Sequence, residues 1–285
     1  MPILKELTPQ WMRTYTGSIT WMYRQVTWSA RGLPDFIIIG AQKSGTTSLF
    51  AYLCQHPQLL PPFKKEVHFF DGGLSPHEDS FKKGKPWYYA HFPLRNRIAA
   101  DQKTFEASPL YIFNPLAPQR IADLIPEVKI ITLLRNPTER AISHYFHERR
   151  KGKEPLTIYE AFQEEERRLE PVIKDGDYKN RVFIHQSYKT RGLYKEQLER
   201  YFRYFSKEQI LVIPSEEFFA KPDMCLKRVF EFVGVDPEYR VSNLMPRNVA
   251  NNKSEVTPSV SEYLDSFFEP HNQALYEMVG VDYGW

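Results

Sequence analysis

The sequence has few cysteines and no long apolar run. Only Cys54 and Cys225 occur among the 285 residues, and they lie far apart. This spacing argues against a disulfide scaffold and a zinc site, and it favours free thiols in a reducing compartment. No stretch has the apolar length of a membrane-spanning helix, and the first residues lack the apolar core of a signal peptide. These features predict a cytoplasmic protein without a transmembrane segment.

An excess of charge of one sign is also missing. The chain has 38 basic and 35 acidic side chains, which gives a formal net charge of +3. So balanced a chain is not expected to bind nucleic acid through general electrostatics, and any anion site has to come from a local pattern. The length suits one α/β domain with elaborations, or at most two small domains.

Residues 1–33 differ in composition from the rest. We expect an aromatic-rich helical extension here, ahead of a domain at 34–285. It either packs on that domain or contacts a membrane surface or partner. Its large apolar and basic residues are Trp11, Met12, Arg13, Tyr15, Trp21, Met22, Tyr23, Arg24, Trp28 and Arg31.

The most informative segment lies at 35–50. Residues 36–39 form an apolar run rich in β-branched side chains, as expected of a strand buried on both faces. Gly40 and Gly45 permit a tight turn into a helix, so that backbone N–H groups and the positive helix end face one anion. The spacing resembles a Walker A loop, with the lysine moved into the turn. We expect a phosphate-binding loop made by Lys43, Ser44, Gly45, Thr46, Thr47 and Ser48.

Other strand patterns alternate with helical patterns. Strands are predicted at 103–107, 128–134 and 209–213, and helices at 46–55, 137–150, 157–169, 188–205, 222–233 and 259–279. This alternation predicts an α/β fold with a P-loop-type central parallel β-sheet flanked by helices on both faces. Ligands of such sheets bind beyond the carboxyl ends of the strands.

A second polar motif follows the strand predicted at 128–134. Asn136 suits a helix N-cap and Pro137 the first helical position, which holds Arg135 at the strand tip. Ser143 lies two turns along the same helix face. An arginine fork and a hydroxyl suit a second phosphate, although an arginine at a strand end is equally well a salt-bridge partner.

Together the two motifs resemble the sulfotransferase family that uses 3′-phosphoadenosine 5′-phosphosulfate (PAPS) as donor and releases 3′-phosphoadenosine 5′-phosphate (PAP). The resemblance implies that the loop at 43–48 binds the 5′-phosphosulfate and that Arg135 and Ser143 bind the 3′-phosphate. It also implies that Lys43 stabilises the departing phosphate. No metal is expected, because protein groups neutralise the phosphates.

The segment at 64–71 resembles the heparan-type and bacterial branch of this family. The resemblance implies that Glu66 is the general base and His68 a neighbouring residue of the acceptor site or proton network. Both side chains would face the same way in an extended segment. Lys253 lies where relatives close over the nucleotide. Ala107 stands where heparan-modifying members have lysine, which disfavours a strongly anionic glycosaminoglycan as acceptor.

The expected reaction is transfer of a sulfuryl group to a hydroxyl of a carbohydrate or small metabolite. A divergent P-loop nucleotide kinase and a non-catalytic nucleotide-binding protein remain alternatives. The segment at 72–93 is expected to be a surface excursion whose aromatic residues either line an acceptor cleft or simply pack beneath a loop. Those residues are Trp87, Tyr88, Tyr89, His91 and Phe92, near Lys82, Lys83 and Lys85.

Overall fold

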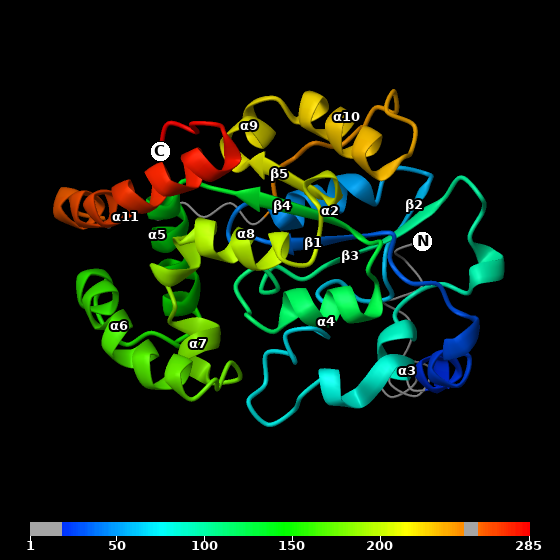
Figure 1. The fold of residues 1–285 in the computed structure, drawn as a ribbon, viewed down its shortest axis with the longest axis horizontal. Helices are drawn as coiled ribbons and strands as arrows, with labels where there is room; N and C mark the ends of the chain where they lie inside the picture. The colour runs from blue at the N-terminus through cyan, green and yellow to red at the C-terminus, as the bar shows by residue number, and fades with distance from the viewer. Residues whose placement is uncertain (1–18, 248–255) are drawn as a thin grey trace, which may run out of the picture.

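A five-stranded parallel sheet forms the centre of the molecule (Figure 1). The computed structural model describes residues 19–247 and 256–285. The strand order is β2-β3-β1-β4-β5. Four strands match the predicted ones to within one residue at each end; β2 was not predicted, since two residues show no periodicity. The strands are β1 (Phe36–Gly40), β2 (Leu59–Leu60), β3 (Lys103–Ala107), β4 (Lys129–Leu134) and β5 (Ile210–Pro214).

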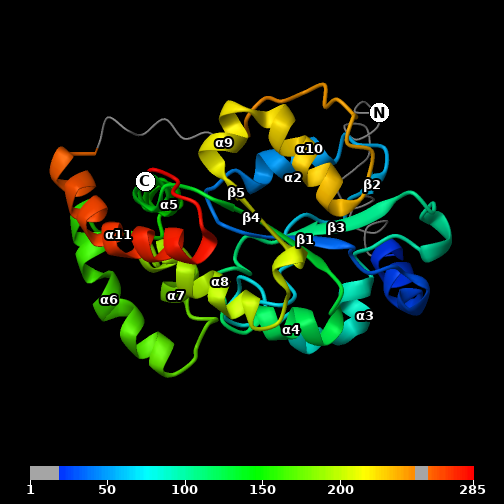
Figure 2. The same ribbon diagram turned by 45° about the horizontal axis from the view of Figure 1, so that its top comes forward.

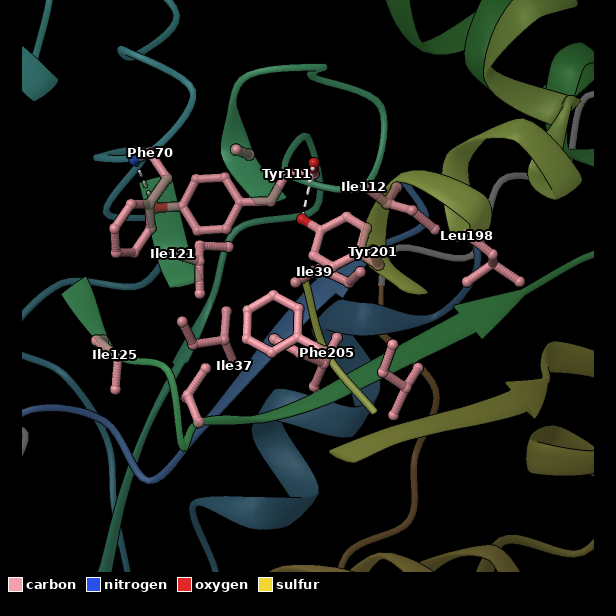
Figure 3. Close-up of a cluster of buried hydrophobic side chains, with 14 of the residues drawn as sticks. Ile37, Ile39, Phe70, Tyr111, Ile112, Ile121, Ile125, Leu198, Tyr201 and Phe205 are labelled. Carbon is pink, nitrogen blue, oxygen red and sulfur yellow. Dashed lines mark hydrogen bonds between the residues drawn. The ribbon is translucent and has the colours of Figure 1, made fainter. Parts of the chain in front are cut away.

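Helices cover both faces of this sheet (Figures 1 and 2). Ile37 and Ile39 of β1 belong to an apolar cluster that includes Leu198 of α8, part of which Figure 3 shows. Ile38 belongs to the opposite cluster, with Leu49 of α2. Burial on both faces explains the unbroken apolar run of β1 and confirms the predicted fold class. The helices are α2 (Thr46–Leu53), α3 (Gly84–Tyr89), α4 (Ala117–Leu124), α5 (Pro137–Arg150), α6 (Ile158–Lys174), α7 (Arg181–His185), α8 (Tyr194–Phe202), α9 (Ser215–Ala220), α10 (Pro222–Val233) and α11 (Pro258–Val279).

The single helix predicted at 188–205 is wrong. Thr190–Gly192 form a short 3-10 helix, and α8 begins at Tyr194. A side chain at position 192 would place its Cβ 2.6 Å from the ring of Phe268 on α11. The local sequence pattern is helical, and it cannot reveal a close approach between segments that lie far apart in the chain.

The expected surface excursion at 72–93 is only partly at the surface. Tyr88, His91 and Phe92 are buried, and Tyr88 stacks on Phe69. A cavity lies beyond the carboxyl ends of β1 and β4, and none of the aromatic residues of this segment is among the described residues that line it. These aromatic residues were expected either to line an acceptor cleft or to pack beneath a loop. The structure shows them packing.

The described part of the N-terminal extension is helical at 19–26 and lies beside α3 (Figures 1 and 2). Trp21 contacts the rings of Phe63 and Trp87. Met22 and Val26 are exposed on this helix. Over residues 19–247 and 256–285, no helix is long and apolar enough to cross a bilayer. Membrane contact through residues 1–33 stays a prediction.

The N-cap of α5 offers a test of how the second motif is held. Asn136 accepts a hydrogen bond from the N–H of Glu139 at 3.1 Å. We expect Asn136→Ala to lower the free energy of unfolding by about 1 kcal/mol, measured by urea denaturation. Asn136→Asp should retain most of the stability, because a carboxylate also caps a helix. Equal stability of the alanine variant and the original protein would show that this cap contributes nothing.

Candidate active site

A cavity of about 1060 Å³ lies beyond the carboxyl ends of β1 and β4. Its lining includes residues from all three predicted motifs, which come from three separate parts of the chain. They are Lys43, Gly45, Thr46 and Thr47 of the phosphate-binding loop, Arg135 and Ser143 of the second motif, and Glu66 and His68 of the third. The fold therefore brings the three motifs to one site.

The phosphate-binding loop has the backbone that its glycine predicts. Gly45 has a φ of 94°, and a Cβ at this position would lie 2.9 Å from the ring of Phe219. Only glycine fits such a conformation and such a close approach. Over the described ranges no side chain caps the N-terminus of α2. Its first N–H groups are therefore available to an anion.

Lys43 is a cation in strongly positive surroundings. Burial, followed by the nearby positive charges of Arg150, Arg135 and Lys151, lowers the pKa of its ammonium to about 8. A lysine with this pKa loses charge readily unless an anion accompanies it. The electrostatics of the loop therefore suit a ligand with several negative charges.

Arg135 ties the two loops of the cavity together. Its guanidinium donates a hydrogen bond to the carbonyl oxygen of Lys43 at 3.3 Å and lies 3.1 Å from a carboxylate oxygen of Glu139. Ser143 lines the cavity two turns along α5. Arg135 was considered as a phosphate contact or as a salt-bridge partner. It makes a salt bridge and also faces the cavity, so the structure is compatible with both roles.

Two residues of the predicted loop lie outside the cavity lining. Ser44 and Ser48 are fully buried, and neither is among the described lining residues. The hydroxyl of Ser48 accepts a hydrogen bond from the N–H of Arg247 at 2.9 Å, so it holds the backbone of a neighbouring segment. Lys253 lies outside the described residues. The roles of these three residues in donor binding stay predictions.

The segment that carries Glu66 and His68 is not extended, so the shared face that an extended segment would give these side chains does not arise in that way. Both residues have a left-handed backbone, with φ of 59° and 54°. Nevertheless Oε2 of Glu66 lies 3.7 Å from Nε2 of His68. Two left-handed residues, rather than strand alternation, bring the two side chains together.

His68 lies between two carboxylates. Its Nδ1 is 2.6 Å from Oδ2 of Asp71. Burial alone would lower the pKa of His68, but the negative charges of Asp71 and Glu66 outweigh it and raise the pKa to about 9. His68 is therefore an imidazolium at neutral pH. Its Nε2 is buried and has no hydrogen-bond partner within the described part of the chain.

Glu66 is held as an anion. Burial alone would raise its pKa, but the adjacent His68 and Lys65 outweigh burial and lower the pKa to about 2. The ammonium of Lys65 lies 2.6 Å from Oε1 of Glu66. A carboxylate of this kind is ionised at any physiological pH, and it is a weak base.

Sequence reasoning missed several residues of the site. Asp71 is the partner of His68, and only its position three residues further along the chain hints at it. His147 lies four residues after Ser143 on the same face of α5, so helical periodicity would have found it. Burial, followed by the charge of Lys43, lowers the pKa of His147 to about 4. Tyr283 and Trp285 also line the cavity, and no local pattern reveals them.

Among the residues that the structure describes, no group of three or more His, Cys, Asp or Glu side chains is arranged to hold a metal ion. The cations present at the cavity are lysine, arginine and histidine side chains.

Known proteins resemble this chain in sequence and in structure. A family profile described as Sulfotransferase domain matches residues 33–266. A crystal structure of a sulfotransferase from Alicyclobacillus acidocaldarius is 31% identical, with a TM-score of 0.70, over 88% of this chain and 97% of that one. A mouse sulfotransferase in complex with PAP shares the fold, at 15% identity and a TM-score of 0.50, over 89% and 90% of the two chains.

Larger proteins match as well. The mouse bifunctional heparan sulfate N-deacetylase/N-sulfotransferase 4 is 34% identical over 220 residues, which cover 75% of this chain and 24% of that protein. The Caenorhabditis elegans bifunctional heparan sulfate N-deacetylase/N-sulfotransferase 1 is 28% identical over 274 residues, or 87% and 30% of the two. The aligned region spans about a quarter of the length of such relatives. With a matching profile over most of its length and three converging motifs, the chain belongs to the sulfotransferase family of enzymes, which transfer a sulfuryl group from PAPS to an acceptor.

Proposed function

We propose that this chain transfers a sulfuryl group from PAPS to a hydroxyl of a carbohydrate or small metabolite, with Glu66 as general base. One observation carries the proposal: a single cavity has two separate anion-binding elements, around Lys43 and around Arg135, and a charged Glu66–His68 pair at its wall. The names of the heparan sulfate relatives support a carbohydrate acceptor.

The two anion-binding elements match the two ends of the donor. Lys43 and the N-terminus of α2 would hold the 5′-phosphosulfate, whose bridging oxygen gains negative charge as the sulfuryl group leaves. Arg135 and Ser143 would hold the 3′-phosphate. A guanidinium can meet a phosphate through two parallel hydrogen bonds, which gives this contact its specificity.

The protonation states divide the roles of Glu66 and His68. The acceptor oxygen forms a bond to sulfur, the bond from sulfur to the bridging phosphate oxygen breaks, and the hydroxyl proton goes to Glu66. His68 cannot take this proton, because it is already protonated. Its buried Nε2 lies 3.7 Å from Oε2 of Glu66 but has no hydrogen-bond partner among the described residues, so its N–H can donate to an oxygen of the acceptor or the sulfuryl group. A weak base suffices if proton transfer is late, since the hydroxyl becomes strongly acidic as its oxygen bonds to sulfur.

The family match decides against a divergent nucleotide kinase. A non-catalytic nucleotide-binding protein would use Lys43 and Arg135, but it would have no use for an imidazolium held between Glu66 and Asp71 at the cavity. Mass spectrometry of a panel of carbohydrate hydroxyl and amine acceptors, incubated with PAPS and the protein, tests the reaction itself. A mass increase of one sulfuryl group is expected on a hydroxyl acceptor, whereas modification of amines alone would overturn the proposed acceptor group.

The chemical step is tested by Glu66→Gln. The amide keeps the shape of the side chain but cannot accept the proton, so we expect single-turnover transfer at saturating PAPS to fall by about 10²- to 10⁴-fold. Binding of PAP should change little. Glu78→Gln is a matched control, since Glu78 is exposed and pairs with Lys83 outside the cavity lining. A Glu66→Gln rate equal to that of the control would remove Glu66 from this role.

The 3′-phosphate contact is tested by Arg135→Ala with two ligands. Loss of a charged hydrogen-bonded partner should weaken PAP binding by about 2 to 5 kcal/mol. Adenosine 5′-phosphate has no 3′-phosphate, so its affinity should hardly change. Isothermal titration calorimetry measures both. If the two nucleotides lost affinity equally, Arg135 would not recognise the 3′-phosphate.

The lowered pKa of Lys43 makes donor binding depend on pH. Near pH 8 the free protein has a mixture of charged and neutral Lys43, whereas an anionic ligand favours the charged form. Binding of PAP should therefore take up protons near pH 8 and weaken as the pH rises further. Calorimetry in buffers with different ionisation enthalpies measures this uptake. Lys43→Ala should reduce it, and an unchanged uptake in that variant would assign it to another group.

A further inference from the structure

Glu106 has a fully buried carboxyl group near the end of β3, and it is not among the described residues of the cavity lining. Three hydroxyl groups donate hydrogen bonds to it. Tyr111 and Tyr88 each lie 2.6 Å from one of its oxygens, and Ser108 lies at 2.9 Å. Burial raises the pKa of this carboxyl, and the three hydroxyls oppose that effect. A buried acid is costly unless it is hydrogen-bonded, and here three donors meet that need.

Two of these three hydroxyls also contact the segment that holds Glu66 and His68. The oxygen of Ser108 accepts the N–H of His68 at 3.1 Å, and that of Tyr111 accepts the N–H of Phe69 at 2.8 Å. A hydroxyl has one hydrogen and two acceptor positions. Because each hydrogen points to Glu106, the lone pairs are left for the backbone of this segment. Glu106 therefore sets both hydroxyls as acceptors.

The segment needs such support, because a left-handed backbone is unfavourable for residues with a Cβ. Glu66 and His68 both adopt it. The N–H of Glu66 also bonds to the carbonyl of Ala107 at 3.1 Å, next to Glu106. Tyr111 is fixed in turn, since Tyr201 donates to its carbonyl oxygen at 3.0 Å (Figure 3).

From these contacts we infer that Glu106 is a positioning residue that, through Ser108 and Tyr111, holds Glu66 and His68 at the place of sulfuryl transfer. This inference rests on the proposed function for the role of that pair. The positions themselves, and the hydrogen bonds that set them, can be measured without any reaction.

The chain offers a matched set of variants. Ser108→Ala and Tyr111→Phe each remove one acceptor from the segment. Tyr88→Phe removes the same kind of buried tyrosine hydroxyl from Glu106, but that hydroxyl donates only to Glu106 among the described contacts. Glu106→Gln keeps the size of the side chain. Its amide group is itself a donor, so it no longer requires the hydroxyls of Ser108 and Tyr111 to donate to it.

The first measurement is hydrogen exchange at the amides of His68 and Phe69. We expect exchange to speed up at least tenfold at His68 in Ser108→Ala, at Phe69 in Tyr111→Phe, and at both in Glu106→Gln. Tyr88→Phe should exchange like the original protein at both positions. Equal acceleration in Tyr111→Phe and Tyr88→Phe would mean a general loss of stability and would overturn the inference.

The second measurement is steady-state transfer from PAPS. Small displacements of reacting groups cost up to about 10²-fold in rate. We expect Ser108→Ala, Tyr111→Phe and Glu106→Gln to lower kcat by about tenfold or more, with an unchanged Kd for PAP and less than a threefold effect in Tyr88→Phe. Unchanged kcat in the first three variants would overturn the positioning role. If the original protein transferred no sulfuryl group, the proposed function would fail, and hydrogen exchange would still decide whether Glu106 holds the segment.

Discussion

The parallel pairing of β1 with β4 is the constraint on which the site depends. Ile38 pairs with Ile131, so both strands end at the same edge of the sheet and release their loops side by side. Each loop leads directly into a helix, α2 or α5, and the two helix N-termini face the same cavity. The hydrogen bond from Arg135 to the carbonyl oxygen of Lys43 joins the loops across this edge. Two loops that lie far apart in the sequence thereby line one cavity.

The two halves of the cavity differ in how their charges are balanced. Around Lys43, burial and then repulsion between positive charges lower the pKa of the lysine to about 8. Around His68 opposite charges alternate, and the imidazolium is stabilised by Asp71 and Glu66. The first half therefore gains most from an incoming polyanion. In the second half the charges of His68, Glu66 and Asp71 already balance one another before any ligand binds.

The positions of Glu66 and His68 are not fixed by a regular helix or strand, because both residues lie in an irregular segment with a left-handed backbone. Its backbone N–H groups instead bond to Ala107, Ser108 and Tyr111, which follow directly from β3. These hydrogen bonds connect the irregular segment to the end of the central sheet. Glu106, buried behind them, gives these contacts their direction.

Features that depend on neighbouring residues could be read from the sequence alone. The apolar run of β1, the glycine at position 45 and the cap at Asn136 follow from local geometry, and with them the fold class and much of the donor loop. The 3-10 helix at Thr190–Gly192 was not predicted, and the close approach of Phe268 to Gly192 joins segments that lie far apart in the sequence.

The pairing of His68 with Asp71, the support from Glu106 and the cavity walls from the C-terminal residues were decided only by the tertiary structure. Hydrogen bonding and burial act through space, and the sequence records only which residues are available for them.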